Sequence, residues 1–296
     1  MSKIAVIADV HLLPETQELI SQLSATTLAF PSQDTQPSAD ELIERTADAD
    51  AVLVSPGTKI TEEYLSSCPS VKYIGICGTS KENVDLDAVE KRHITLTNVV
   101  DYGDEPAAEF IFMQLEYLVR GMGQNQWKDY PTELMGKKMG IIGLGALGTA
   151  IANLALAYKM DVSYHSKTRR PEQEQLGVSY SEKDELLKTC QIIVICTPSN
   201  LVAISKDDFE LIQSNVIIVQ ASMGMCLDQG AFLDWIKQDS NFALFDYSAG
   251  NESYEAYKDL PRVIFPKVIA GHTQETKQRL GDKVIQNLKK YLEGNV

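Results

Sequence analysis

The sequence predicts an α/β protein with parallel sheets arranged in two domains. Short apolar runs alternate with helix-length amphipathic segments along most of the 296 residues, and this alternation occurs as two successive series. Strands separated by helices favour right-handed crossovers, which pair the strands in parallel. The length agrees with two domains, because one domain contains about 100–200 residues.

The first series occupies roughly the first hundred residues. Its apolar runs are short and bounded by polar segments, as in buried strands, and the intervening segments carry apolar residues at helical spacing. The predicted strands are residues 3–9, 26–30, 51–55, 72–77 and 94–99, and the predicted helices are residues 15–24, 39–47, 61–68 and 83–92.

A long helix is predicted between the two series, over residues 105–121, with Pro106 in its first turn and Gly121 at its end. A polar, turn-rich connection over residues 123–138 follows it. The second series then predicts strands at residues 138–143, 160–166, 191–197, 215–221, 242–248 and 263–266. The final segment, residues 273–294, predicts a helix long enough to travel between domains.

Composition excludes several classes of function. The chain has 41 acidic and 27 basic side chains and a net charge of −14, so it should repel phosphate backbones, and we expect no nucleic-acid partner. The N-terminus lacks a signal-peptide layout and no apolar stretch approaches the ~20 residues of a membrane span, so no membrane partner is expected. The scattered cysteines show neither disulfide nor zinc-ligand spacing, which predicts a cytoplasmic protein without a metal centre. These cysteines are Cys68, Cys77, Cys190, Cys196 and Cys226.

The strongest local signal is a glycine motif at the start of the second series. Gly143, Gly145 and Gly148 form the pattern G-x-G-x-x-G directly after an apolar strand and at the start of a helix, with Ala146 and Leu147 between the last two glycines. In this context the first glycine allows a tight turn, the second lets the backbone approach a pyrophosphate, and the third lets helix and strand pack closely. The motif therefore predicts dinucleotide binding, the alternative being a glycine-rich turn of another α/β protein.

The next predicted strand ends where such a unit recognises the ribose. An NAD-binding unit normally carries Asp or Glu here, about 20 residues beyond the glycines, but this chain has Ser166 followed by Lys167, Thr168, Arg169 and Arg170. A carboxylate would repel a ribose 2′-phosphate, whereas a hydroxyl beside cations would bind it. NADP(H) is therefore the preferred cofactor and NAD(H) the second choice, while a solvated basic loop is the alternative interpretation.

Nearly the whole chain resembles the D-isomer-specific 2-hydroxyacid dehydrogenase family. The resemblance rests on the order and spacing of specific segments. They are GTSKENVDLDAVEKRHITLTNV, EPAAEFIFMQLEYLVR, GKKMGIIGLGALG, ICTPSN, VIIVQASMG, LFDYS and IAGHTQET.

The family fold implies a discontinuous, flavodoxin-like substrate domain, here residues 1–103 plus 271–296, and a Rossmann domain over residues 104–270, with the active site in the cleft between them. It also implies a homodimer formed through the nucleotide domain and the helix 106–120. Further cofactor contacts implied by the resemblance are Cys196, Thr197, Pro198, Ala221, Ser222, Asp246 and Gly271, and substrate contacts are Cys77, Gly78, Thr79 and Tyr102.

The chain departs from the family at each of its three catalytic positions. In the family a hydride passes from nicotinamide to the carbonyl carbon of a 2-oxoacid while an Arg binds the substrate, a His donates the proton and a Glu holds that His. Here Met223 stands at the Arg position, Asn251 at the Glu position with Glu252 one step later, and Lys267 at the His position. An ammonium can donate a proton or polarise a carbonyl, and burial would lower its pKa.

These departures leave two hypotheses of different class. The first is an NADPH-dependent reductase of a small carbonyl compound with Lys267 as its acid/base group. The second is a catalytically inactive nucleotide-binding sensor, because a lysine that merely replaces a lost acid explains the residue equally well. An ordinary dehydrogenase that uses Glu252 is a third alternative. Asp9 and His11 resemble the first ligand pair of a metallophosphatase, but no later cluster completes such a site.

Overall fold

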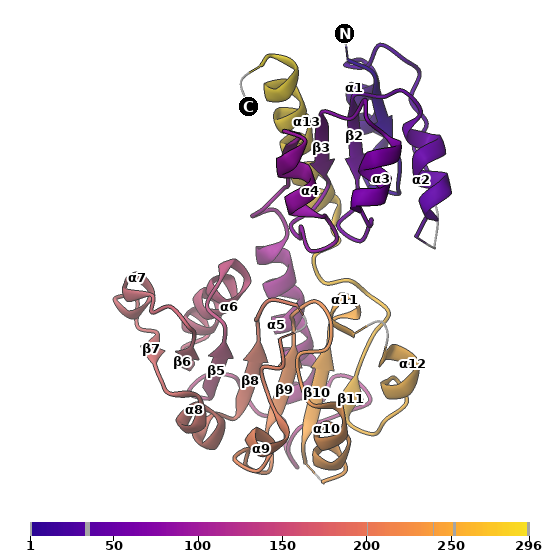
Figure 1. Ribbon diagram of the computed structural model, residues 1–296. Helices are drawn as coiled ribbons and strands as arrows, with labels where there is room; N and C mark the ends of the chain where they lie inside the picture. The colour runs from indigo at the N-terminus through magenta and orange to yellow at the C-terminus, as the bar shows by residue number, and fades with distance from the viewer. Residues whose placement is uncertain (1, 33–35, 200, 239, 251–252, 295–296) are drawn as a thin grey trace. The chain divides into compact units, whose positions relative to one another are not determined.

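The computed structural model describes residues 2–32, 36–199, 201–238, 240–250 and 253–294. Within these ranges the chain forms two compact units, one comprising residues up to Tyr102 together with the segment from Thr273, and the other running from Gly103 to His272 (Figure 1). Both units are α/β, which confirms the predicted fold class.

The N-terminal unit contains a parallel sheet in the order β1-β2-β3-β4. Its strands are β1 (Ile4–Val6), β2 (Ala51–Val54), β3 (Tyr73–Ile76) and β4 (Thr95–Thr97). Its helices are α1 (Pro14–Ser21), α2 (Ala39–Thr46), α3 (Glu62–Ser67), α4 (Leu86–Lys91) and the C-terminal α13 (Gln274–Leu292).

The second unit contains a parallel sheet in the order β11-β10-β9-β8-β5-β6-β7. This order reverses between β5 and β8, as in Rossmann folds, where the dinucleotide binds beyond the carboxyl ends of the strands at the reversal. The strands are β5 (Lys138–Ile142), β6 (Asp161–His165), β7 (Ser179–Tyr180), β8 (Ile192–Ile195), β9 (Ile217–Gln220), β10 (Phe242–Phe245) and β11 (Val263–Ile264). The helices are α5 (Asp104–Arg120), α6 (Ala146–Ala157), α7 (Pro171–Glu174), α8 (Lys183–Thr189), α9 (Lys206–Phe209), α10 (Gln229–Ile236), α11 (Tyr247–Gly250) and α12 (Tyr254–Tyr257).

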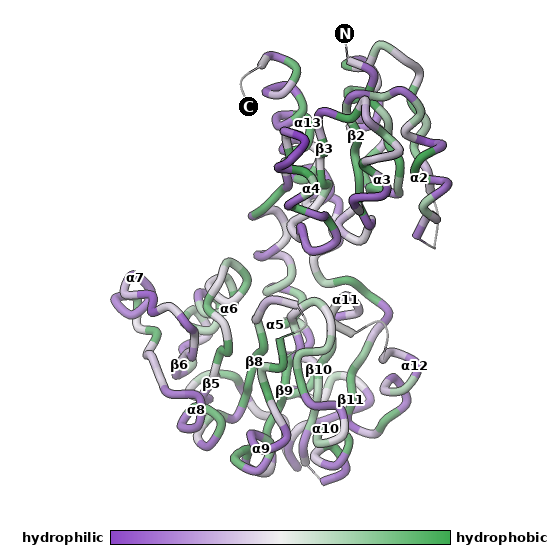
Figure 2. Tube along the Cα trace, viewed as in Figure 1, coloured by the Kyte–Doolittle hydropathy of each residue, from purple (hydrophilic) through white to green (hydrophobic). Residues whose placement is uncertain are grey.

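The strands are apolar because helices cover both faces of each sheet. Along β8, Ile192 and Val194 pack in the cluster formed with α5 and α6, whereas Ile193 and Ile195 pack in the cluster formed with α8 and α10. Side chains alternate between the faces of a strand, so a strand buried on both sides is a continuous apolar run. Figure 2 shows these runs as green segments along the central strands.

The long α5 helix ends as predicted. Gly121 adopts φ 63°, a left-handed conformation that glycine adopts without strain, and its N–H donates to the carbonyl of Leu118. The predicted long C-terminal helix is also present as α13. It packs on α1 and β3 of the N-terminal unit, with Leu280, Val284 and Leu288 buried.

Residues 26–30, predicted as a strand, form none in the structure. This segment lies just after Ala25, whose N–H donates to the carbonyl of Ser2, but no ladder follows. Leu28 and Phe30 instead pack partly buried on the apolar cluster beneath α13. The apolar side chains thus have a packing role that requires no strand pairing.

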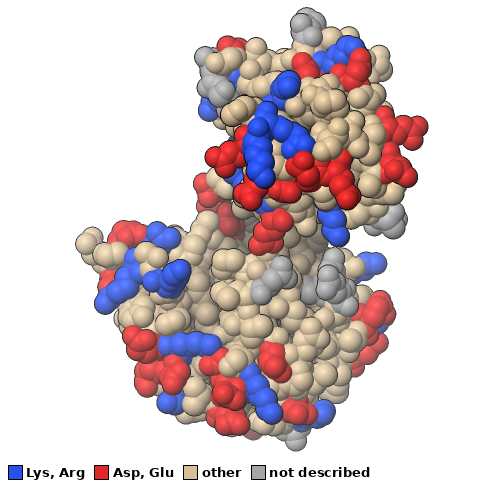
Figure 3. Space-filling view, in the orientation of Figure 1, with Lys and Arg blue, Asp and Glu red and all other residues tan. Residues whose placement is uncertain are grey.

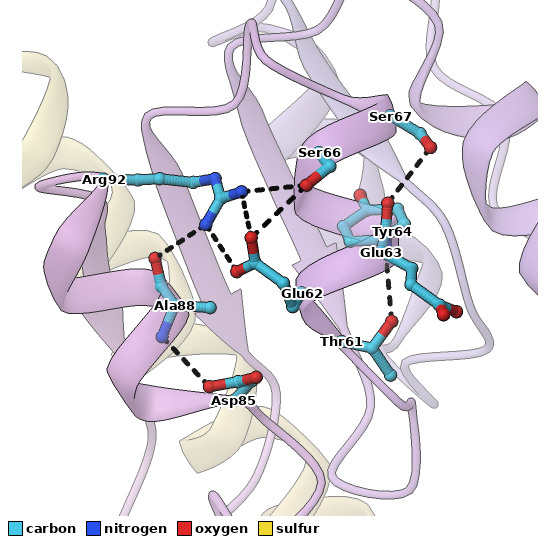
Figure 4. A network of polar contacts seen from close by, with 9 residues as sticks. All are labelled: Thr61, Glu62, Glu63, Tyr64, Ser66, Ser67, Asp85, Ala88 and Arg92. Carbon is cyan, nitrogen blue, oxygen red and sulfur yellow. Dashed lines mark hydrogen bonds and ion pairs between the residues drawn. The ribbon is translucent and has the colours of Figure 1, made fainter.

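A charged clamp joins two helices of the N-terminal unit. Arg92, directly after α4, donates two hydrogen bonds of 2.6 Å to the carboxylate of Glu62 on α3 and one of 2.9 Å to Ser66 (Figure 4). These hydrogen bonds hold the pKa of the Glu62 carboxyl below its usual range. The clamp fixes α3 against α4 on the outside of the sheet.

Candidate functional site

The glycine motif forms the turn that it predicts between β5 and α6. Gly143 has φ 97°, and its N–H donates to the carbonyl of His165 at 2.8 Å, at the end of the neighbouring strand β6. A Cβ on Gly143 would lie 2.5 Å from the carbonyl oxygen of Cys196, and a Cβ on Gly148 would lie 2.2 Å from that of Gly143. Neither position has room for a side chain, because the obstacle is backbone in both cases.

Gly145 differs from the other two glycines, since a Cβ there would meet nothing within 4 Å. The side of the turn at Gly145 is therefore open, and Gly145 and Ala146 are exposed at the start of α6. The first intrahelical hydrogen bond runs from Thr149 N–H to Gly145 O, so the N–H groups of Ala146, Leu147 and Gly148 have no acceptor within the helix. This open, donor-rich cradle fits the pyrophosphate of a dinucleotide.

The basic loop follows β6 beside this turn. Ser166 is half-buried, whereas Lys167, Thr168, Arg169 and Arg170 are exposed, and basic side chains gather around α7 in the space-filling view (Figure 3). The guanidinium of Arg169 forms an ion pair of 2.5 Å with Glu174. This pairing could not be read from sequence spacing alone.

Arg170, the last cation of the predicted basic cluster, reaches the glycine turn. Its Nε donates to the carbonyl oxygen of Leu144 at 3.3 Å, and Leu144 lies between the first two glycines of the motif. A permanent positive charge therefore contacts the glycine turn. The signal in the sequence was the run of cations itself, which ends at this residue.

The ends of β8 and β9 bring two further predicted cofactor segments together. Ser222 Oγ donates to the carbonyl of Ile195 at 3.2 Å and lies 3.5 Å from Thr197 Oγ1. The buried thiol of Cys226 lies 3.8 Å from the carbonyl oxygen of Pro198, the residue after Thr197. Burial raises the pKa of the Cys196 thiol. Cys196 is therefore a packing residue rather than a nucleophile.

Asp246 and Gly271 join a third strand end to the last segment of this unit. The Asp246 carboxylate accepts hydrogen bonds from the N–H of Ala270 at 3.0 Å and from Ser248 Oγ at 2.5 Å. A Cβ on Gly271 would lie 3.3 Å from the carbonyl oxygen of Gly103. Asp246 is thus engaged in anchoring the segment that leads into Gly271. Ala221, at the end of β9, is buried, and its N–H donates to the carbonyl of Ile195.

The structure describes two of the three positions that depart from the family pattern. Lys267 is exposed, and its Nζ lies 5.8 Å from the ring centroid of Tyr247. Burial of Lys267 was expected, and that expectation is wrong because the side chain is exposed. Met223 is 53% exposed and carries no charge. Asn251 and Glu252 lie outside the described residues.

The predicted substrate loop of the N-terminal unit is tightly built. A Cβ on Gly78 would lie 2.3 Å from Pro56 Cγ and 3.4 Å from the hydroxyl of Tyr102. Thr79 Oγ1 donates to the carbonyl of Val99, and among the described residues the N–H groups of Gly78 and Thr79 have no acceptor. The loop therefore offers two backbone donors beside a phenol hydroxyl.

Cys77 contributes only backbone to this loop. Its side chain lies in the apolar core and burial raises the pKa of its thiol to about 12. Any contact of Cys77 with a ligand would therefore be made by its backbone.

The described residues also bear on two other kinds of site. None of their helices is long and apolar enough to cross a membrane. Groups of three or more His, Cys, Asp or Glu side chains able to hold a metal ion are likewise absent from the described ranges. Asp9 and His11 contact each other at 3.1 Å.

The model of the D-isomer specific 2-hydroxyacid dehydrogenase catalytic domain matches residues 4–296, and the chain belongs to that family. It is an oxidoreductase of the class that acts on CH–OH and C=O groups with a nicotinamide cofactor. The chain is 26% identical to a glyoxylate reductase of Thermococcus litoralis, over 88% of this chain and 86% of the relative.

Two solved structures show the same fold. The chain superposes on D-lactate dehydrogenase of Aquifex aeolicus in complex with NAD and lactic acid with a TM-score of 0.81 at 22% identity, covering 99% of this chain and 96% of the other. It superposes on an acyclic imino acid reductase, Bsp5, in complex with NADPH and D-Arg with a TM-score of 0.84 at 21% identity, covering 99% and 98%.

Proposed function

We propose that the protein is an NADPH-dependent reductase that transfers hydride to the carbonyl carbon of a small 2-oxoacid or related carbonyl compound. The observation that carries the proposal is the contact of Arg170 with Leu144, which sets a permanent cation against the glycine turn. A ribose 2′-phosphate needs such a charge, whereas the 2′-hydroxyl of NAD(H) is normally bound by a carboxylate.

The cofactor would be held at three places in the second unit. The N–H groups that begin α6 would bind the pyrophosphate, and the basic loop of residues 166–170 would lie beside the 2′-phosphate. The strand ends would hold the nicotinamide half through Cys196, Thr197, Pro198, Ala221, Ser222, Asp246 and Gly271. The bound nicotinamide would supply the hydride.

The chain's own groups would bind and protonate the substrate. In the N-terminal unit, the N–H groups of Gly78 and Thr79 would hold a substrate carboxylate beside the Tyr102 hydroxyl. Lys267 would hold a proton at Nζ, polarise the carbonyl oxygen and donate that proton as negative charge develops on the oxygen. Lys267 is exposed, so its ammonium group is accessible to a bound substrate.

Activity and binding measured side by side test this proposal. NADPH oxidation is followed at 340 nm with glyoxylate, hydroxypyruvate, pyruvate and simple aldehydes, and NADPH affinity is measured by fluorescence. Lys267→Ala should lower kcat by at least about 100-fold, the size of a general-acid contribution, while the NADPH Kd stays unchanged.

Lys258→Ala is the matched control, because Lys258 Nζ lies 5.5 Å from the ring of Tyr254, a similar cation–aromatic contact in the same unit. It should leave kcat unchanged. Tight NADPH binding without turnover of any of these carbonyl compounds would instead support the nucleotide-binding sensor.

We also infer a homodimer through α5 in the cytoplasm. The outer side of α5 borders a cavity of about 470 Å³ whose lining is mostly apolar, and Met113 and Tyr117 on it are about half exposed. An exposed apolar face of this kind marks an interaction surface. Met113→Glu should convert a dimer to a monomer in light scattering, and a monomeric wild type would refute the inference.

The five free cysteines agree with a reducing compartment.

A further inference from the structure

A single carboxylate orders the basic loop between β6 and α7. Glu174, the last residue of α7, accepts a hydrogen bond of 2.8 Å from the hydroxyl of Tyr164 on β6. The same carboxylate accepts two hydrogen bonds from Arg169, of 3.0 Å from Nε and 2.5 Å from the terminal nitrogen. Both of its oxygens are therefore engaged, and Arg169 is held in a planar, two-point pairing.

A second contact of Arg169 is with an aromatic ring. The guanidinium lies 4.7 Å from the ring centroid of Tyr180 on β7, within the range of a cation–π contact. Tyr180 in turn meets Tyr164 edge-on, with ring centroids 5.5 Å apart. Arg169 is thus clamped between an aromatic ring and a carboxylate, and its charge is already neutralised by Glu174.

The neighbouring Arg170 is held by the same cluster but in another way. Its backbone N–H donates to the Tyr164 hydroxyl at 2.7 Å. The side chain then reaches Leu144 O in the glycine turn at 3.3 Å. Lys167 is exposed and forms no ion pair with any residue that the structure describes.

We propose that Glu174 is a specificity-determining residue for the 2′-phosphate of NADPH, acting by position rather than by contact. We call the hydrogen-bonded group of Tyr164, Glu174 and Arg169 the strut, because it holds the loop in shape. The cations that the strut presents to the phosphate are Lys167 and Arg170. This inference rests on the proposed preference for NADPH and gives the basic residues different roles. Arg169 supports the loop, whereas Lys167 and Arg170 meet the phosphate.

The direction in which NADPH affinity changes when Glu174 loses its charge distinguishes the strut from direct phosphate binding by Arg169. If Arg169 binds the phosphate directly, Glu174 competes for it, and removing the carboxylate charge must tighten NADPH binding. If Glu174 orders the loop, the same change weakens NADPH binding although it adds one positive charge to the protein. NADH, which has no 2′-phosphate, should be little affected in either case.

The test measures the Kd of NADPH and of NADH for the full-length protein by fluorescence titration, with 2′,5′-ADP and 5′-AMP as competing probes. Glu174→Gln should raise the ratio of the NADPH Kd to the NADH Kd about fivefold to tenfold, as expected for a lost charge-assisted pairing. Arg169→Ala should have the same effect, and the double variant should add little to either single change. Arg170→Ala should raise the same ratio at least about tenfold, through direct loss of charge.

Glu172→Gln is the matched control, because it removes an equal charge from the same short helix at an exposed position and should leave the ratio unchanged. Tyr164→Phe keeps the ring and removes the shared hydroxyl, so it tests the strut if Glu174→Gln lowers Tm strongly. An unchanged or lowered ratio in Glu174→Gln overturns the inference while leaving the proposed function intact. A wild-type protein that binds NADH more tightly than NADPH refutes the cofactor proposal itself and the inference with it.

Discussion

Replacing Gly148 by alanine should destabilise the second unit through one identifiable clash. The new Cβ would lie 2.2 Å from the carbonyl oxygen of Gly143, and real Cβ atoms essentially never approach closer than 3.0 Å. Backbone must therefore move by about 0.8 Å where β5 meets α6. We expect a net loss of about 1–2 kcal/mol, because overpacking costs about 1–3 kcal/mol and the better helix propensity of alanine returns up to about 1 kcal/mol.

Gly145→Ala provides the opposite case in the same turn. Its Cβ meets no atom within 4 Å, so the free energy of unfolding should change by less than about 0.5 kcal/mol. The methyl group would occupy the open side where a pyrophosphate approaches, so the NADPH Kd should rise at least about tenfold, or 1.4 kcal/mol. Urea unfolding and fluorescence titration measure the two effects. A stable Gly148→Ala protein, or a Gly145→Ala protein with unimpaired binding, would refute the assignment of these roles.

Two further predictions concern the N-terminal unit. Gly281→Ala on α13 should lower the free energy of unfolding, measured in urea, by about 1–3 kcal/mol, because the new Cβ would lie 2.4 Å from Thr16 Oγ1 on α1. Adding Thr16→Ala to this variant should restore most of the lost stability, and no recovery would contradict the contact. Because Arg92 lowers the pKa of Glu62 from its ordinary 4.5, the stabilising effect of their pairing should be present above pH 4.5 and disappear as the pH falls through the lower folded-state value. Tm measured against pH for the wild type and Glu62→Gln checks this, and a difference that persists at the acid end would disprove it.

The glycine motif and most of the strands were predictable because their signals are local. A strand buried on both faces must be apolar throughout, and Gly143 and Gly148 are required by backbone geometry within one turn. The segment 26–30 satisfied the same apolar rule without pairing, because burial of Leu28 and Phe30 against a cluster completed by α13 depends on a distant part of the chain.

The candidate site was less predictable for a similar reason. Sequence spacing identified the basic loop but not the pairing of Arg169 with Glu174, since that contact requires the loop, α7 and Tyr164 to meet in space. Lys267 was predicted to be buried but is exposed. Matching a position of the family pattern indicates where a residue lies in the fold, and not how much solvent reaches its side chain.

The steady-state rate of NADPH oxidation at saturating NADPH, compared between the wild type and Lys267→Ala, decides whether Lys267 supports carbonyl reduction. The wild type should turn over at least one 2-oxoacid, and the variant should show a kcat reduced at least about 100-fold with NADPH affinity retained. Equal turnover in both proteins would contradict the role of Lys267, and absence of turnover in the wild type despite tight NADPH binding would contradict the enzymatic assignment.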